Sequence, residues 1–319
     1  MRQDTRLRYL LGEIGGYALI YSGIARLFLN WRLSRGEATA FYLHNPDQQV
    51  FEKIMTRARA WGFEFVDDTR LLDFIDGRSP SGRSLLHVSV DDGWRDNLRN
   101  IVGFAERNQI PITYFICTES TDAGTFWWDR VPDFATASKL RRMSNGERIR
   151  YLEGIQTGSA TLPLAGDDAR RTAMTADEVA ALAKMRHATI GNHTHSHPVF
   201  ARCGDEEIDA ELVEAHRRLT DLTGVAPRSF AYPCGSTNGY EQQVLKRLGY
   251  QIAYTTEPRG VRIGEVNRYD IPRFEDNRHG GPAENFCRMI GLWETIYHTL
   301  RRRYKALKRL FGVKPRVLA

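Results

Sequence analysis

Hydrophobic positions along this chain alternate between short apolar runs and helical periods. The apolar runs at Ala38–His44, Ser84–Val90 and Pro111–Thr118 predict buried strands. Between them, Phe51–Gly62 and Asp96–Asn108 have the spacing of amphipathic helices. This alternation predicts parallel strands with helices packed outside them.

The alternation continues through the second half of the chain. We expect helices at Thr175–His187, Glu206–Gly224 and Tyr240–Leu248, the first of them led by the capping-box pair Thr175 and Glu178. The expected strands are one ending at His193, then Ser229–Tyr232, Gln251–Thr255 and the region around Asp270–Phe274. About seven such β-α units favour a barrel over an open sheet.

Three segments fall outside this pattern. Residues 7–32 look helical and apolar but contain glycines, and residues 127–170 form a polar, partly helical insertion. From Met289 onward an apolar stripe lies beside dense basic charge. We therefore expect an apolar helical extension at 1–36, a barrel at 37–286 that carries the insertion, and a basic amphipathic helix at 287–319.

Composition and charge then limit the classes of function. The 319 residues are 42% hydrophobic and 26% charged, which is typical of a globular protein. The formal net charge is +6, but the basic residues concentrate near the two ends and lack an aromatic-lined groove pattern, which argues against nucleic-acid binding. The four cysteines, Cys117, Cys203, Cys234 and Cys287, have no CxxC spacing and are expected to be free thiols.

The ends of the chain bear on its location. The longest early run without charge, Ile14–Ala25, is too short to span a bilayer. No cleavable signal is recognised, so we expect a cytoplasmic protein. The C-terminal stripe beside basic residues suits peripheral contact with the anionic inner face of the membrane. The alternative is that the stripe packs on the barrel and the basic face is solvated.

Two adjacent carboxylates follow the strand Ser84–Val90. Asp91 and Asp92, with Gly93, come where an apolar strand ends, and barrel active sites are built at such ends. One carboxylate can bind a metal ion while the other reaches a water molecule. A solvated Asp-Gly turn is the alternative interpretation.

Three of the nine histidines lie within five residues. His193 and His197 are four positions apart, so a helical turn or a tight loop could aim both at one ion, while His195 points elsewhere. Two histidines and one carboxylate leave coordination positions open, as in catalytic metal sites. Such a site favours Zn²⁺, with Co²⁺, Ni²⁺ or Mn²⁺ as alternatives. Water bound to such an ion becomes a nucleophile near neutral pH, which suits hydrolysis of an amide or ester.

Two further segments carry candidate chemistry. In Phe230–Gly235 a strand enters a Pro-Gly turn, where the backbone N–H of Cys234 can point at a developing oxyanion. In Tyr269–Phe274, Arg273 can pair with a carboxylate of the site. A plain strand-ending turn and an exposed arginine without catalytic contact are the alternatives.

Taken in this order, the motifs over residues 38–275 resemble the NodB-homology polysaccharide deacetylases of the carbohydrate esterases. The first family motif is similar to Val88–Trp94, the second to His193–His197, and the third to Phe230–Gly235. Tyr114–Ile116 and Phe126–Arg130 add to the likeness with the subgroup whose third motif is Phe-Ala-Tyr-Pro-x-Gly. The resemblance implies a distorted (β/α)7 barrel with N- and C-terminal helical extensions and a helical insertion.

The resemblance also implies roles for single residues. Asp91 matches the catalytic base, and Asp92, His193 and His197 match the ligands of one divalent metal ion, most simply Zn²⁺. Ala231 stands where many relatives carry an arginine that orients the base, and Arg273 is the candidate substitute. No motif for the general-acid histidine is found, and His44 and His279 both remain candidates. Tyr232, Trp128 and His44 are expected to bind substrate.

The function implied is removal of an acyl group, most simply N-acetyl, from an amino sugar of a glycan or lipid-linked saccharide in envelope or exopolysaccharide biosynthesis. The alternative, from another class, is a glycan-binding protein of the same fold that has lost catalysis. The four residues Asp91, Asp92, His193 and His197 favour the enzyme, because a protein without catalysis has no need to keep them.

Overall fold

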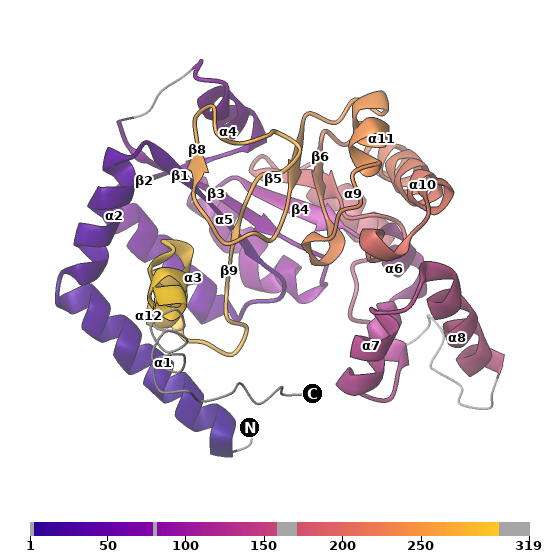
Figure 1. Cartoon of the computed structure of the whole chain (residues 1–319), viewed down its shortest axis with the longest axis horizontal. Helices are drawn as coiled ribbons and strands as arrows, with labels where there is room; N and C mark the ends of the chain where they lie inside the picture. The colour runs from indigo at the N-terminus through magenta and orange to yellow at the C-terminus, as the bar shows by residue number, and fades with distance from the viewer. Residues whose placement is uncertain (1–2, 79–81, 158–170, 300–319) are drawn as a thin grey trace, which may run out of the picture.

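The computed structural model describes residues 3–78, 82–157 and 171–299. A single curled sheet forms its centre (Figure 1). The strands are β1 (Glu37–Leu43), β2 (Phe63–Val66), β3 (Ser84–Val90), β4 (Ile112–Ile116), β5 (Ala188–Asn192), β6 (Ser229–Ala231), β7 (Ile252–Tyr254), β8 (Val261–Arg262) and β9 (Phe274–Glu275).

The sheet runs in the order β7-β6-β5-β4-β3-β1-β8, with β2 paired to β3 and β9 paired to β1. Every pair is parallel except β1 with β8. A bridge between Tyr254 and Ile271 ties β7 to the segment that leads into β9, and β9 pairs with β1. The sheet thus closes on itself as the predicted distorted (β/α)7 barrel.

Helices surround the barrel and extend from it (Figure 1). They are α1 (Gln3–Tyr21), α2 (Ile24–Ser34), α3 (Gln48–Ala60), α4 (Asp68–Ile75), α5 (Gly103–Arg107), α6 (Thr118–Ala123), α7 (Phe134–Leu140), α8 (Asn145–Thr157), α9 (Ala176–Leu182), α10 (Asp205–Thr223), α11 (Glu241–Arg247) and α12 (Pro282–Met289). A π-helical turn at Leu98–Val102 leads into α5, and residues 292–299 form a further helix after α12. Helices α7 and α8 lie together at one side of the barrel, within the predicted insertion.

The strands form where the sequence places continuous apolar runs. All seven residues of β3 are buried, as expected for a parallel strand covered on both faces. Helix α9 starts with the predicted capping box: Glu178 N–H donates to Thr175 Oγ1 and Thr175 N–H donates to the Glu178 carboxylate. Strands β2 and β8 and helix α4 were not predicted from the sequence, since they span only 4, 2 and 8 residues.

The N-terminal extension is two helices, because Gly23 adopts a left-handed conformation with φ of 83° between α1 and α2. Ala25 and Leu29 of α2 belong to the main hydrophobic core. Arg32 is buried, pairs with Glu37 at 2.8 Å and donates to the Ile290 carbonyl. The α2 part of the extension is therefore packed into the barrel rather than separate from it.

The C-terminal segment differs from the expected single helix after residue 287. Residue 287 lies inside α12, and Gly291, with φ of 76°, separates α12 from the helix at 292–299. Met289 is buried in the core and Ile296 packs against it, so the start of the apolar stripe faces the barrel. The rest of the stripe and its basic face, at 300–319, and the end of the insertion, at 158–170, lie outside the described residues. Within the described part of the chain, none of the helices is long and apolar enough to cross a membrane.

Candidate metal and active site

The carboxyl ends of the barrel strands surround an open cavity of about 730 Å³. Asp91 and Asp92 follow β3, His193 follows β5, and Cys234 follows β6. Because parallel strands end at the same edge of a barrel, motifs far apart in sequence meet there. Seven of the predicted site residues line this cavity together: His44, Asp91, Asp92, Trp128, His193, His197 and Cys234.

Asp92, His193 and His197 converge on one point. Asp92 Oδ1 lies 3.4 Å from Nε2 of His193 and 3.4 Å from Nε2 of His197, and one ligand atom from each residue lies within 4.8 Å of the others. All three residues are buried. Among the described residues, no other group of three His, Cys, Asp or Glu side chains brings its ligand atoms together in this way.

The chemistry of these atoms fits a divalent cation. Asp92 Oδ1 is buried yet makes no hydrogen bond, which is costly unless a cation completes the site. His193 Nδ1 lies 2.8 Å from the Ala231 carbonyl, which orients the ring and leaves Nε2 for a ligand bond. Trp94 Nε1 donates to the other Asp92 oxygen at 2.9 Å and holds the carboxylate in place.

The protonation states also fit a metal site. Burial would raise the pKa of Asp92, but the adjacent imidazoles of His193 and His197 hold it well below its ordinary value. Burial lowers the pKa of His197 to about 4. Near neutral pH, Asp92 is therefore ionised and His197 neutral, the forms in which these side chains bind metal ions.

The local backbone is strained at the ligand positions. Asp92, Thr194 and His197 have positive φ values of 74°, 70° and 56°. Residues other than glycine rarely adopt this conformation, and such strain clusters at functional sites. Asp92 is turned by this conformation toward the histidine loop, whereas Asp91, one position earlier, faces another way.

Asp91 pairs with Arg273 rather than with Asp92, His193 and His197. Arg273 donates from both terminal nitrogens to the two Asp91 oxygens at 2.8 Å each. Its remaining donors reach the Ser89 hydroxyl and the Thr255 carbonyl at 3.0 Å. Burial would raise the pKa of Asp91, but the charges of Arg273 and His193 outweigh this effect and lower it. Asp91 is therefore an oriented, ionised carboxylate beside Asp92, His193 and His197. Arg273 is buried rather than exposed.

The remaining predicted residues divide between the cavity and the core. The rings of Trp128 and His197 are inclined at 70° with centroids 4.8 Å apart, and Cys234 occupies a left-handed position (φ 55°) in the turn after β6. Tyr232 is not at the cavity: its side chain is fully buried and its hydroxyl donates to the Tyr269 carbonyl. Because the Tyr232 side chain has no exposed surface, it does not contact substrate directly.

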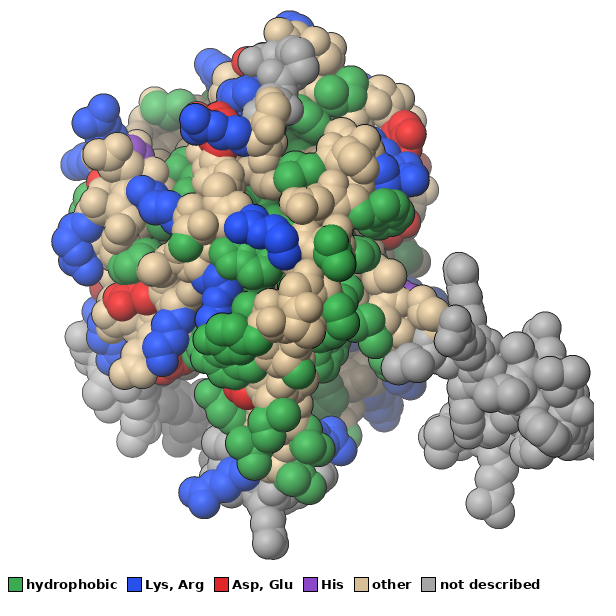
Figure 2. Space-filling view, turned by 90° about the vertical axis from the view of Figure 1, so that its left-hand side faces the viewer, with side chains coloured by type: hydrophobic (Ala, Val, Ile, Leu, Met, Phe, Trp, Pro, Cys, Tyr) green, Lys and Arg blue, Asp and Glu red, His purple; other side chains and the backbone are tan. Residues whose placement is uncertain are grey.

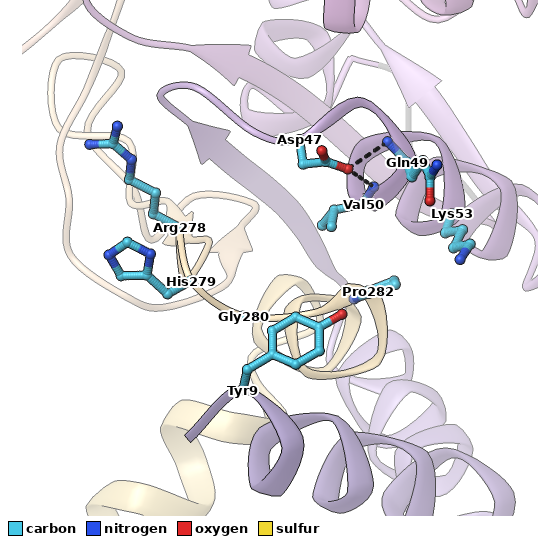
Figure 3. A pocket seen from close by; sticks show the side chains of 9 residues that line it. All are labelled: Tyr9, Asp47, Gln49, Val50, Lys53, Arg278, His279, Gly280 and Pro282. Carbon is cyan, nitrogen blue, oxygen red and sulfur yellow. Dashed lines mark hydrogen bonds between the residues drawn. The ribbon is translucent and has the colours of Figure 1, made fainter. Parts of the chain in front are cut away.

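The structure separates the two candidate acid histidines. His44 lines the catalytic cavity, with Nδ1 4.0 Å from Glu275. Burial would lower the pKa of His44, but the carboxylates around it, those of Asp92 and Asp91 first, outweigh this and raise it. His279 instead lines a different pocket, beside Tyr9 and Lys53 (Figure 3).

The model of the polysaccharide deacetylase family matches residues 78–253, more than half of the 319 residues. The chain belongs to the polysaccharide deacetylase family. No curated protein sequence matches it.

Several solved structures share the fold of this member of the polysaccharide deacetylase family. The deacetylase PplD of Streptococcus pyogenes, in complex with acetate, has a TM-score of 0.57 at 13% identity, covering 80% of this chain and 98% of its own. IcaB from Ammonifex degensii has a TM-score of 0.57 at 15% identity, covering 81% and 98%. The BpsB deacetylase domain from Bordetella bronchiseptica has a TM-score of 0.55 at 17% identity, covering 75% and 96%. At these identities the likeness establishes the fold alone.

Two charged residues that support the histidine loop of the deacetylase were missed by the sequence analysis. Glu211 of α10 accepts hydrogen bonds from the backbone N–H groups of His195 and Ser196, at 2.9 and 2.8 Å. Arg148 of α8 donates to the carbonyls of Ser196 and His197. The insertion thus contributes directly to the loop that carries His197. In the sequence both residues look like ordinary charged positions of helices, so no local signal identifies them.

His195 lies on the outer side of this loop, as predicted. Its Nδ1 is 2.9 Å from the Thr118 hydroxyl, and its backbone carbonyl accepts from the Glu119 N–H and from the Cys117 thiol. His195 therefore ties the loop to the end of β4 and is not one of the three candidate metal ligands.

Proposed function

We propose that this polysaccharide deacetylase is a metal-dependent hydrolase that removes an acyl group, most simply N-acetyl, from an amino sugar. The substrate would be a glycan or lipid-linked saccharide of envelope or exopolysaccharide biosynthesis. The observation that carries the proposal is the ionised Asp91, held by Arg273, next to the convergent Asp92, His193 and His197.

Asp92 Oδ1 and Nε2 of His193 and His197 would hold one divalent ion, with Zn²⁺ favoured by the two imidazoles and one carboxylate. When bound, this ion would polarise the acyl carbonyl and lower the pKa of a water molecule. Asp91 would accept a proton from the water molecule that attacks the carbonyl carbon. Arg273 keeps Asp91 ionised and aimed at the cavity.

The other cavity residues complete the reaction. The backbone N–H of Cys234 would donate to the developing oxyanion. His44 would donate a proton to the leaving amine as the C–N bond breaks, which yields acetate and the free amino sugar. His44 is preferred to His279 because it lies in the same cavity as Asp91. Trp128 offers an aromatic face to the sugar ring.

We place this reaction at the cytoplasmic face of a membrane with anionic lipids. The support is the run of basic residues near the end of the chain: Arg301, Arg302, Arg303, Lys305, Lys308, Arg309, Lys314 and Arg316. We further propose that residues 37–286 form the catalytic barrel, with 1–36 and 287–319 as extensions.

The test is release of acetate from N-acetylated oligosaccharides and lipid-linked N-acetylated sugars. The purified chain is stripped with a chelator and reloaded separately with Zn²⁺, Co²⁺, Ni²⁺ or Mn²⁺. We expect acetate release only after reloading, and loss of it in Asp91→Asn. Saccharide binding without acetate release under every metal would instead favour the catalytically inactive glycan-binding protein.

A further inference from the structure

Helix α1 faces the barrel with its small residues and solvent with its large ones. Gly12 and Gly16 are buried against α12, and a Cβ atom built on Gly16 would lie 2.5 Å from the Ala283 carbonyl carbon. Leu10, Leu11 and Ile14, by contrast, are 54–59% exposed. A surface helix of a globular protein ordinarily has the opposite arrangement, with its apolar stripe toward the core. The outward face of α1 therefore needs another apolar environment.

This face continues along α2. Eight exposed large hydrophobic side chains of these two helices form what we call the apolar band: Leu7, Leu10, Leu11, Ile14, Tyr21, Ile24, Leu27 and Trp31. Figure 2 looks onto the side of the molecule where α1 and α2 lie, and green hydrophobic side chains run down it with blue basic side chains beside them. Contiguous exposed apolar surface of this kind marks an interaction site.

The exposed charged side chains between residues 6 and 36 are all arginines: Arg6, Arg8, Arg26 and Arg35. Arg35 also pairs at 3.4 Å with Glu37, whose side chain is almost completely covered. The single carboxylate in that range, Glu13, is buried and accepts hydrogen bonds from the first N–H groups of α12, at Ala283 and Glu284. The band therefore presents apolar side chains and arginines without an exposed carboxylate.

We propose that the apolar band docks this protein on an anionic lipid surface. Exposed leucines and isoleucines, a tryptophan and a tyrosine beside arginines are the composition of helices that lie in a membrane interface. A second copy of the chain is disfavoured because its own arginines would face these. The segment 300–319 is disfavoured for the same reason, since its charged residues are all Lys or Arg. Anionic headgroups match the arginines, and acyl chains match the band.

The side of α1 opposite the band faces the barrel. Tyr9, on the same side of α1 as Gly12 and Gly16, lines a pocket of about 290 Å³ together with Arg278 and His279 (Figure 3). Arg278 also lines the catalytic cavity, so α1 and the loop that carries Arg278 lie between the band and the site. This step rests on the proposed function: docking through the band favours a saccharide that is carried by a lipid in the same membrane.

Vesicle binding tests the surface directly. The full chain is sedimented with vesicles of phosphatidylcholine alone, or of phosphatidylcholine mixed with phosphatidylglycerol, at low and high salt. We compare it with the triple variant Leu10→Gln, Leu11→Gln, Ile14→Gln. The matched control replaces exposed apolar residues elsewhere, Met185→Gln, Val213→Gln and Val225→Gln. Circular dichroism melting verifies that both variants are folded.

We expect the unmodified chain and the control to bind the anionic vesicles, less at high salt, and the band variant to bind about tenfold more weakly or worse. Equal binding by the band variant, or an unmodified chain that ignores anionic vesicles at low salt, would overturn the inference. So would a dimer, seen by light scattering, that the band variant breaks. Turnover of a soluble N-acetylated oligosaccharide is measured separately, so failure of the proposed hydrolase and failure of the docking surface are distinguishable.

Discussion

Arg273 forms two 2.8 Å hydrogen bonds to the carboxylate of Asp91, although the two residues are 182 positions apart and both are buried. The neighbouring Asp92 is not reached by this guanidinium and faces the two histidines instead. Two adjacent carboxylates are thereby given different partners and, we propose, different roles.

The two aspartates should respond differently to the same substitution. Asp91→Asn should leave metal affinity nearly unchanged while lowering turnover by about 10²-fold or more, because a positioned base is lost. Asp92→Asn should weaken metal binding itself, because an amide oxygen carries no charge for the ion. Metal titration by calorimetry, beside acetate release, measures both effects. Equal loss of metal in the two variants would show that the roles are wrongly assigned.

Replacing Arg273 should affect both stability and the pH profile. Arg273→Gln leaves Asp91 buried without its partner, and removing one member of a buried pair costs about 3–5 kcal/mol. The pKa of Asp91, now lowered by Arg273, should rise. Loss of activity on acidification should therefore begin at a higher pH than in the unmodified enzyme. Urea unfolding and kcat/KM against pH measure the two effects.

The pair of Asp91 and Arg273 also makes the stability of the fold depend on pH. Because the folded pKa of Asp91 is lowered, its contribution is present above the ordinary carboxyl pKa and is lost as pH falls through the folded value. In Arg273→Gln this contribution should be absent. Arg268→Gln, at an exposed arginine that pairs with Asp76, is the matched control and should leave both profiles unchanged. An unchanged acid limb in Arg273→Gln would remove Arg273 from the mechanism.

The proton donor can be identified by changing the leaving group. His44→Asn should slow release of acetate from an amide by about 10²-fold, since the amine must be protonated as it leaves. An activated aryl acetate, whose phenolate leaves without a proton, should be affected far less. The pKa of His44 is raised, so the unmodified enzyme should lose amide turnover only above the ordinary histidine range, and His44→Asn should lack that limb.

His279→Asn is the control for this assignment. His279 lies in the neighbouring pocket, so its replacement should leave both substrates and the alkaline limb unchanged. If His279→Asn instead reproduced the amide-specific loss, the proton donor would be His279, and the loop that carries it would have to rearrange during the reaction.

The loop that holds the metal ligands should depend on Glu211. Its Oε2 accepts the backbone N–H groups of His195 and Ser196, and its Oε1 accepts the Ser196 hydroxyl, so Glu211→Ala removes all three acceptors. The loop would loosen, and metal affinity should fall by about 10- to 100-fold, as for other residues behind metal ligands. Glu214→Ala, one turn along α10 with its partners Arg217 and Arg218 at the surface, should not change affinity. Metal competition with a chromophoric chelator gives the comparison.

Local patterns in the sequence determined a large part of this protein. Strand β3 and the aspartates that follow it, the four-residue spacing of His193 and His197, and the capping box of α9 were all predicted, because each depends on neighbours within about one turn or one strand. The order of strands and helices was enough to predict a barrel. The fold and the candidate metal ligands could therefore be named before any coordinates.

Tertiary structure decided what depends on distant segments. Whether Arg273 reaches Asp91, whether His44 or His279 shares their cavity, and whether Tyr232 is exposed all follow from how the barrel closes through Ile271 and β9. The outward direction of the α1 leucines was equally hidden, since an apolar helix has the same sequence pattern whichever face meets the core. The periodicity of the sequence shows that α1 has an apolar face. Only the packing of α1 against α12 decides which face of the helix remains exposed.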